Sequence, residues 1–149
     1  MKDRKEKLYI AYGSNLNREQ MALRCPTAQV VGTATLKNWR LMFYSVVTIE
    51  RQKGGQVPVL VWRIQPRDEQ ALDRYEGWPC LYRKEKLRVT VDGRRVYAMA
   101  YIMNTEGRHY CAPGRGYLGT IHRGYLDADF DRGILMRAVE DSDKEGKLK

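Results

Sequence analysis

One acidic residue stands where the local pattern makes a carboxylate unfavourable. Glu76 comes four residues after Leu72 and directly after Tyr75, so a helix over this segment places Glu76 on the apolar side. It also falls in the last helical turn, where the helix dipole disfavours negative charge. Burial and the dipole both raise the pKa of a carboxyl group, as a general acid–base residue working at pH 7 requires. Glu76 is therefore a candidate acid–base residue.

An ordinary surface role for Glu76 stays open at this point. If the end of the helix frays, the carboxylate reaches water or pairs with Arg74 or Arg83. In that case the side chain is solvated or ion-paired, and it takes no part in catalysis.

A second candidate is the tight turn Gly13-Ser14-Asn15, which ends the apolar run Leu8–Tyr12. The run is short, aromatic and β-branched, so it predicts a buried strand. Asn17 and Gln20 have the spacing of a helix N-cap and its partner, so a helix should begin after the turn. This arrangement directs backbone N–H groups to one spot near a positive helix end, which suits a carboxylate or an oxyanion. An ordinary β–α turn, with glycine at φ > 0 and a capping asparagine, explains the same residues.

The elements that must position these residues follow from periodicity and turn signals. The pattern predicts helices over 18–24, 66–75, 113–123 and 129–140, and strands over 8–12, 29–36, 39–49, 57–64, 81–91 and 96–103. It predicts a turn at Lys37-Asn38, a polar loop over 50–55 and a hairpin turn at Asp92-Gly93. Strands and helices do not alternate as in a doubly wound sheet. The order favours an α+β fold, a small, mostly antiparallel β-barrel flanked by helices.

The chain length of 149 residues suits one domain, and no linker, repeat or low-complexity block divides it. We predict a single domain over residues 1–149, with the charged ends 1–7 and 141–149 flexible. No apolar run suits a transmembrane helix or a signal peptide, so no membrane partner is expected. Three widely spaced cysteines, Cys25, Cys80 and Cys111, indicate free thiols, no metal site and a cytoplasmic location.

The net charge of +9 raises the question of a nucleic-acid partner. The 27 lysine and arginine residues are spread along the whole chain, and their densest clusters contain acidic residues or alternate as in strands. No helix-turn-helix, zinc-finger or RNA-recognition pattern occurs. We therefore expect no nucleic-acid partner, and a basic surface that attracts small acidic molecules toward the site. The sequence makes no prediction about the oligomeric state.

Four segments occur in an order that resembles a known superfamily. Tyr12-Gly13-Ser14-Asn15-Leu16 follows an apolar strand, and Leu72-Asp73-Arg74-Tyr75-Glu76-Gly77 comes later. Tyr82 then follows within Leu81-Tyr82-Arg83, and Ala112-Pro113 precedes Tyr117-Leu118. This ordered set is similar to the γ-glutamylcyclotransferase-like superfamily, which includes γ-glutamylcyclotransferase, γ-glutamylamine cyclotransferase and AIG2-like proteins.

The resemblance implies a small β-barrel flanked by helices and a reaction that needs no cofactor. The free α-amine of a small-molecule γ-glutamyl substrate attacks its own γ-carbonyl, which yields 5-oxoproline and a free amine or amino acid. By this resemblance Glu76 is the general acid–base residue. The backbone of one loop would hold the substrate carboxylate and the developing oxyanion, and two tyrosines would shape the pocket. These residues are Tyr12, Gly13, Ser14, Asn15, Leu16, Tyr82 and Tyr117.

Two other classes of function remain as alternatives. One is a non-catalytic binding module that recognises a carboxylated ligand with the Tyr12–Leu16 loop. The other is a basic nucleic-acid binder, whose affinity falls steeply with salt. Glu76 separates the enzyme from both, because neither alternative has a use for an unpaired buried carboxylate.

Overall fold

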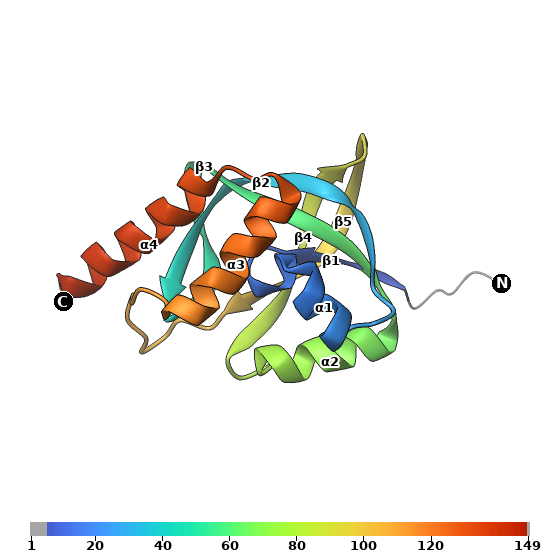
Figure 1. Ribbon diagram of the computed structural model, residues 1–149, viewed down its shortest axis with the longest axis horizontal. Coiled ribbons are helices and arrows are strands. Elements are labelled where there is room, and N and C mark those ends of the chain that lie inside the picture. Colours follow the sequence, from blue (N-terminus) through green and yellow to red (C-terminus); the bar gives the residue numbers. More distant parts are fainter. Residues whose placement is uncertain (1–5, 149) are drawn as a thin grey trace.

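Five strands form one curled sheet with four helices packed around it in the computed structural model, which describes residues 6–148 (Figure 1). The strands are β1 (Lys7–Ala11), β2 (Gln29–Tyr44), β3 (Val46–Ile64), β4 (Tyr82–Val91) and β5 (Arg94–Met103). The helices are α1 (Arg18–Arg24), α2 (Pro66–Glu76), α3 (Arg115–Ala128) and α4 (Arg132–Lys147), and a 3₁₀ turn covers Ser14–Leu16. The predicted α+β class is confirmed.

The sheet has the order β2-β3-β1-β5-β4, with β1 in the centre. All its ladders are antiparallel except the one between β1 and β5, which are parallel and paired at Tyr9 and Met99. The edge strands β2 and β4 approach each other, since a Cβ on Gly32 would lie 3.1 Å from Val91 Cγ2. Over residues 6–148 no ladder joins these two edges, so the predicted barrel is a curled sheet that stays open along one seam.

The predicted turn at Lys37-Asn38 is wrong, and so is the polar loop over 50–55. β2 and β3 form one long hairpin that reverses at Ser45, where φ is 69°. Asn38 does have a positive φ of 71°, but it marks a bulge in β2 rather than a turn. Its side-chain oxygen accepts a hydrogen bond of 3.0 Å from the N–H of Gly54 on β3, so the two strands continue past the bulge.

Helices α1 and α2 begin and end at the predicted signals, whereas α3, predicted over 113–123, runs from Arg115 to Ala128. Asn17 caps α1 by accepting a hydrogen bond of 2.9 Å from the Gln20 N–H. α2 starts at Pro66, where φ is fixed and no N–H is lost from the helix, and it stops at Gly77, which has the left-handed φ of 67°. Glu76 is therefore the last residue of a well-formed helix.

Secondary structure reaches into both ends that the sequence predicts to be flexible. Lys7 begins β1, while residues 1–5 and 149 lie outside the described residues. Helix α4 continues past Glu140 to Lys147, because its inner face packs on β2. Ser142 is fully buried there and accepts a hydrogen bond of 2.8 Å from the Phe43 N–H.

The buried core lies between the concave face of the sheet and the helices. α1 and α2 cover one end of the sheet and α3 and α4 the other, as Figure 1 shows. Fully buried side chains come from both groups of helices, among them Met21, Leu72 and Tyr125. Across residues 6–148, each helix is too short or too polar to cross a bilayer.

Candidate active site

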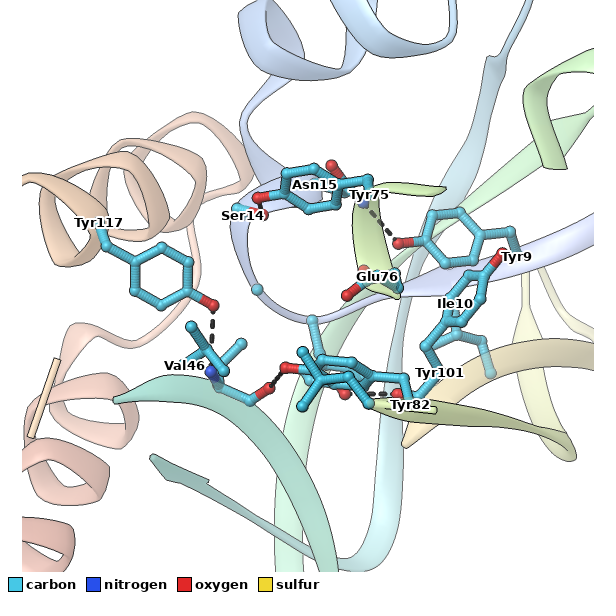
Figure 2. A pocket seen from close by; sticks show the side chains of 14 residues that line it. Tyr9, Ile10, Ser14, Asn15, Val46, Tyr75, Glu76, Tyr82, Tyr101 and Tyr117 are labelled. Atoms are coloured by element: carbon cyan, nitrogen blue, oxygen red, sulfur yellow. Dashed lines mark hydrogen bonds between the residues drawn. The ribbon is translucent and has the colours of Figure 1, made fainter. Parts of the chain in front are cut away.

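A cavity of about 270 Å³ lies at the end of β1 (Figure 2). The Gly13–Asn15 turn, the end of α2 and Tyr117 of α3 meet around it. Six of the chain's ten tyrosines line it, together with one carboxylic acid. The lining residues are Tyr9, Ile10, Tyr12, Gly13, Ser14, Asn15, Val46, Val47, Tyr75, Glu76, Leu81, Tyr82, Tyr101 and Tyr117. Seven of the eight residues predicted for the site are therefore gathered around one space.

Glu76 lies in the middle of the tyrosines in Figure 2, and its carboxyl group has no partner among the described residues within hydrogen-bond or ion-pair distance. Neither predicted pairing occurs. Arg83 instead pairs with Glu85 at 2.7 Å, and Arg74 is exposed without an ion pair in the described part of the chain. Burial raises the pKa of the Glu76 carboxyl to about 7, while the positive charge of Arg24 acts in the opposite direction. A carboxyl with this pKa exchanges protons readily near neutral pH.

Position 13 is occupied by glycine because the turn passes very close to Val47. Its φ is −128°, so the expected positive φ is wrong. A Cβ at this position would overlap Cγ1 of Val47, which also lines the cavity. Only glycine lets the turn pass this close to the start of β3 without moving it.

The turn keeps three backbone donors free for a bound group. The N–H of Leu16 donates to the Gly13 carbonyl oxygen, and that of Asn17 to the Ser14 carbonyl oxygen, both at 3.0 Å. The N–H groups of Gly13, Ser14 and Asn15 find no acceptor among residues 6–148. These three donors, close to the Glu76 carboxyl, suit an anionic or strongly polarised oxygen.

Leu16 does not line the cavity, in contrast to the prediction for the loop. Its N–H already closes the 3₁₀ turn, and its side chain is fully buried. It packs so closely on α3 that a Cβ on Gly124 would overlap it. Leu16 therefore fixes the turn on α3 and leaves the binding groups to the residues before it.

The predicted tyrosines anchor the cavity wall. The Tyr82 hydroxyl donates to the Val47 carbonyl oxygen at 2.5 Å, and the Val47 N–H donates to the Tyr117 hydroxyl at 3.0 Å. The Tyr12 hydroxyl donates to the Tyr101 carbonyl oxygen at 2.5 Å. Burial raises the pKa of Tyr12, Tyr82 and Tyr117, so all three stay neutral at pH 7. Tyr82 and Tyr117 join β3 to β4 and to α3, and Tyr12 joins the start of the turn to β5, so the three bonds give the wall a fixed shape.

Three further tyrosines of the wall were not predicted: Tyr9, Tyr75 and Tyr101. Tyr9 accepts a hydrogen bond of 2.8 Å from the Asn15 side-chain amide, and the Tyr75 hydroxyl lies 2.7 Å from the Ser14 hydroxyl. One signal was available in the composition, because the chain has ten tyrosines and only two phenylalanines. That ratio indicates a need for hydroxyl groups on buried aromatic rings.

Metal ligands do not gather in the described part of the chain, where no three His, Cys, Asp or Glu side chains come together. The cavity offers acid–base and hydrogen-bonding chemistry through Glu76, the backbone donors and the tyrosine hydroxyls.

Comparisons with known proteins point to one family. A family model described as "Gamma-glutamyl cyclotransferase, AIG2-like" matches residues 9–118, which include every residue that lines the cavity. The human protein named gamma-glutamylcyclotransferase is 30% identical over 163 residues, which cover 98% of this chain and 85% of the relative. The mouse protein of the same name is 28% identical over 158 residues, which cover 95% of this chain and 82% of the relative.

Solved structures share the fold. A human protein described as uncharacterized protein loc79017 superposes with a TM-score of 0.76 at 25% identity, covering 93% of this chain and 87% of that one. A structure named gamma-glutamyl cyclotransferase superposes with a TM-score of 0.75 at 24% identity, covering 92% of this chain and 86% of that one.

The matches and the unpaired carboxyl in the cavity define an enzyme of the γ-glutamylcyclotransferase class. Family membership was the expectation from four short motifs, and the family model spans all four. The chain belongs to the AIG2-like gamma-glutamyl cyclotransferase family.

Proposed function

We propose that this enzyme converts a γ-glutamyl amine or a γ-glutamyl amino acid into 5-oxoproline and a free amine, by intramolecular attack of the α-amine on the γ-carbonyl. One observation carries the proposal: the unpaired Glu76 carboxyl, with a pKa of about 7, lines the same cavity as the turn whose N–H groups find no acceptor. An acid–base group beside oxyanion donors is what a cyclising acyl transfer requires.

Glu76 has two successive tasks in this reaction. As a carboxylate it takes a proton from the substrate's α-ammonium group, and the amine then attacks the γ-carbonyl carbon. The C–N bond to the leaving group breaks as the protonated Glu76 gives that proton to the departing nitrogen. The second proton of the attacking nitrogen passes to the released amine, which leaves as an ammonium ion. A pKa of about 7 makes both forms accessible at neutral pH, so neither proton transfer is strongly uphill.

The turn and the tyrosines would hold the substrate in the bent shape that closes a five-membered ring. The N–H groups of Gly13, Ser14 and Asn15 would bind the α-carboxylate or the oxyanion that forms at the γ-carbonyl. The hydroxyl hydrogens of Tyr9 and Tyr117 have no acceptor in the described structure, since both oxygens act only as acceptors there. They are further donors for substrate oxygens. Fixing the folded conformer removes an entropic cost from ring closure.

The size of the cavity supports a small substrate. Its volume of about 270 Å³ lies near the lower end of small-molecule sites, which span roughly 300–1,000 Å³. This space suits the glutamyl group, and we expect the leaving group to lie toward the half-exposed Tyr75. The reaction as written needs no cofactor. A cytoplasmic location remains a prediction, supported by Cys25, Cys80 and Cys111 as free thiols.

A product assay tests the proposal. The purified protein is incubated with a panel of γ-glutamyl amines and γ-glutamyl dipeptides, and 5-oxoproline is measured by mass spectrometry. Glu76→Gln keeps the shape of the side chain and removes its acid–base function, so the rate should fall by at least about 10²-fold. Glu19→Gln is the matched control, because Glu19 is exposed on α1 and should leave the rate unchanged. Absence of product across the panel, or an active Glu76→Gln enzyme, contradicts the proposal.

A further inference from the structure

Arg24 is the last residue of α1, and its guanidinium group makes three contacts. One nitrogen donates to the side-chain oxygen of Asn15, and another donates to the side-chain oxygen of Gln20 at 3.2 Å. The guanidinium carbon also lies 3.5 Å from the centre of the Tyr75 ring, so the group stacks on that ring. Arg24 does not line the cavity, and it supports the wall from behind.

These contacts connect the two halves of the site. Asn15 belongs to the turn that carries the free N–H groups, and Tyr75 directly precedes Glu76 in the last turn of α2. A second link runs in parallel, because the hydroxyls of Tyr75 and Ser14 lie 2.7 Å apart. α1 continues directly from the turn, whereas these side-chain contacts join α2 to it, so they help to set the distance between the acid–base group and the backbone donors.

The charge of Arg24 has no counter-ion in the described part of the chain, where it forms no ion pair. The other titratable groups that face Glu76 are tyrosines, from β1, α2, β4, β5 and α3. They are Tyr9, Tyr12, Tyr75, Tyr82, Tyr101 and Tyr117. A tyrosine in its usual neutral form carries no charge at pH 7. Arg24 is therefore the charged group that acts on the Glu76 carboxyl.

We propose that Arg24 is a positioning residue that holds the Gly13–Asn15 turn in register with the end of α2. The planar guanidinium suits this role, because it bonds to Asn15 with its edge while its face covers Tyr75. From this place its charge also acts on the Glu76 carboxyl. A lysine supplies the charge but not this combination of contacts. The inference rests on the proposed acid–base role of Glu76.

An NMR titration tests the electrostatic part without any turnover. The protein is labelled with ¹³C at the glutamate carboxyl groups, and Glu76→Gln identifies the Glu76 signal. In Arg24→Gln the titration midpoint of Glu76 should move upward by about half a pH unit or more, because an attractive charge is lost. Arg74→Gln removes an equal charge from an exposed side chain two residues before Glu76. In this variant the titration midpoint of Glu76 should stay at the wild-type value. An unmoved midpoint in folded Arg24→Gln overturns this part.

Arg24→Lys tests the positioning part and decides the matter if Arg24→Gln does not fold. The Glu76 midpoint should stay near the wild-type value, because the charge is kept. The amides of Leu16 and Asn17, which donate to carbonyl oxygens within the turn, should exchange with solvent at least about tenfold faster, because the turn loses its bond to Arg24 and the stacked guanidinium. Exchange at the wild-type rate overturns the positioning role. A chain that makes no 5-oxoproline contradicts the proposed function and leaves both measurements valid.

Discussion

The raised pKa of Glu76 makes a quantitative prediction about stability. The carboxyl has a pKa of about 7 in the folded protein, against 4.5 for an ordinary glutamate. Below pH 4.5 it is protonated in both the folded and unfolded states and does not change the free energy of unfolding. As the pH rises from 4.5 to 7, the unfolded state ionises while the folded state stays protonated, so the folded state loses stability until the loss levels off above pH 7. At 1.36 kcal/mol for each pH unit between the two pKa values, the loss reaches at most about 3 kcal/mol by pH 8.

Glu76→Gln removes this loss, since the amide does not ionise. The variant should be as stable as the wild type near pH 4 and more stable by up to about 3 kcal/mol at pH 8. Urea denaturation at pH 4, 6 and 8, followed by tryptophan fluorescence, measures the difference in the free energy of unfolding. A gain in stability combined with a loss of activity is the expected signature of a site residue kept for function.

Glu69→Gln is the contrasting control on the same helix. Burial raises the pKa of Glu69, but hydrogen bonds from Lys84 and Lys7 outweigh it and lower the pKa. Its contribution is therefore present above the unfolded pKa and lost as the pH falls through the folded one, so Glu69→Gln should destabilise the protein at pH 8. A difference between Glu76→Gln and wild type that is constant with pH, or negative at pH 8, would refute the reasoning.

Three further predictions concern the groups that hold the site. Gly13→Ala should weaken binding of 5-oxoproline at least about tenfold, because the new Cβ overlaps Val47; equal affinity by calorimetry would contradict the close approach. Tyr117→Phe leaves the Val47 N–H unpaired and should cost about 1–3 kcal/mol in urea denaturation, with unchanged stability counting against the bond. Ser142→Ala leaves the Phe43 N–H unpaired and should cost a similar amount; a melting temperature equal to wild type would show that α4 is not anchored there.

Local signals predicted the parts of the site that local chemistry determines. Pro66 and Gly77 mark the ends of α2, and the i, i+4 spacing from Leu72 places Glu76 on the buried side. Asn17 likewise marks the start of α1. These residues act on neighbours within one or two turns, so the sequence alone contains the information.

Long-range pairing explains what the sequence could not predict. Asn38 has the conformation of a turn residue, and only the continuing ladder between β2 and β3 shows that it lies in a bulge. Gly13 is glycine because Val47 approaches it, and Arg24 contacts Tyr75 across a gap of many residues. α4 extends through a charged segment because Ser142 packs on β2. Each of these depends on a partner far away in the chain.

The central position of β1 has a consequence for the order in which the molecule assembles. The hairpins β2–β3 and β4–β5 each join strands that are neighbours in sequence, so their closure costs little chain entropy. β1 bridges them by pairing Lys7 with Ile64 and Tyr9 with Met99, contacts that span much of the chain. The reactive turn follows β1 directly, so we expect the cavity to form only when the two hairpins have docked. In a refolding experiment, recovery of enzyme activity should then coincide with the last step of folding, and a partly folded chain should be catalytically silent.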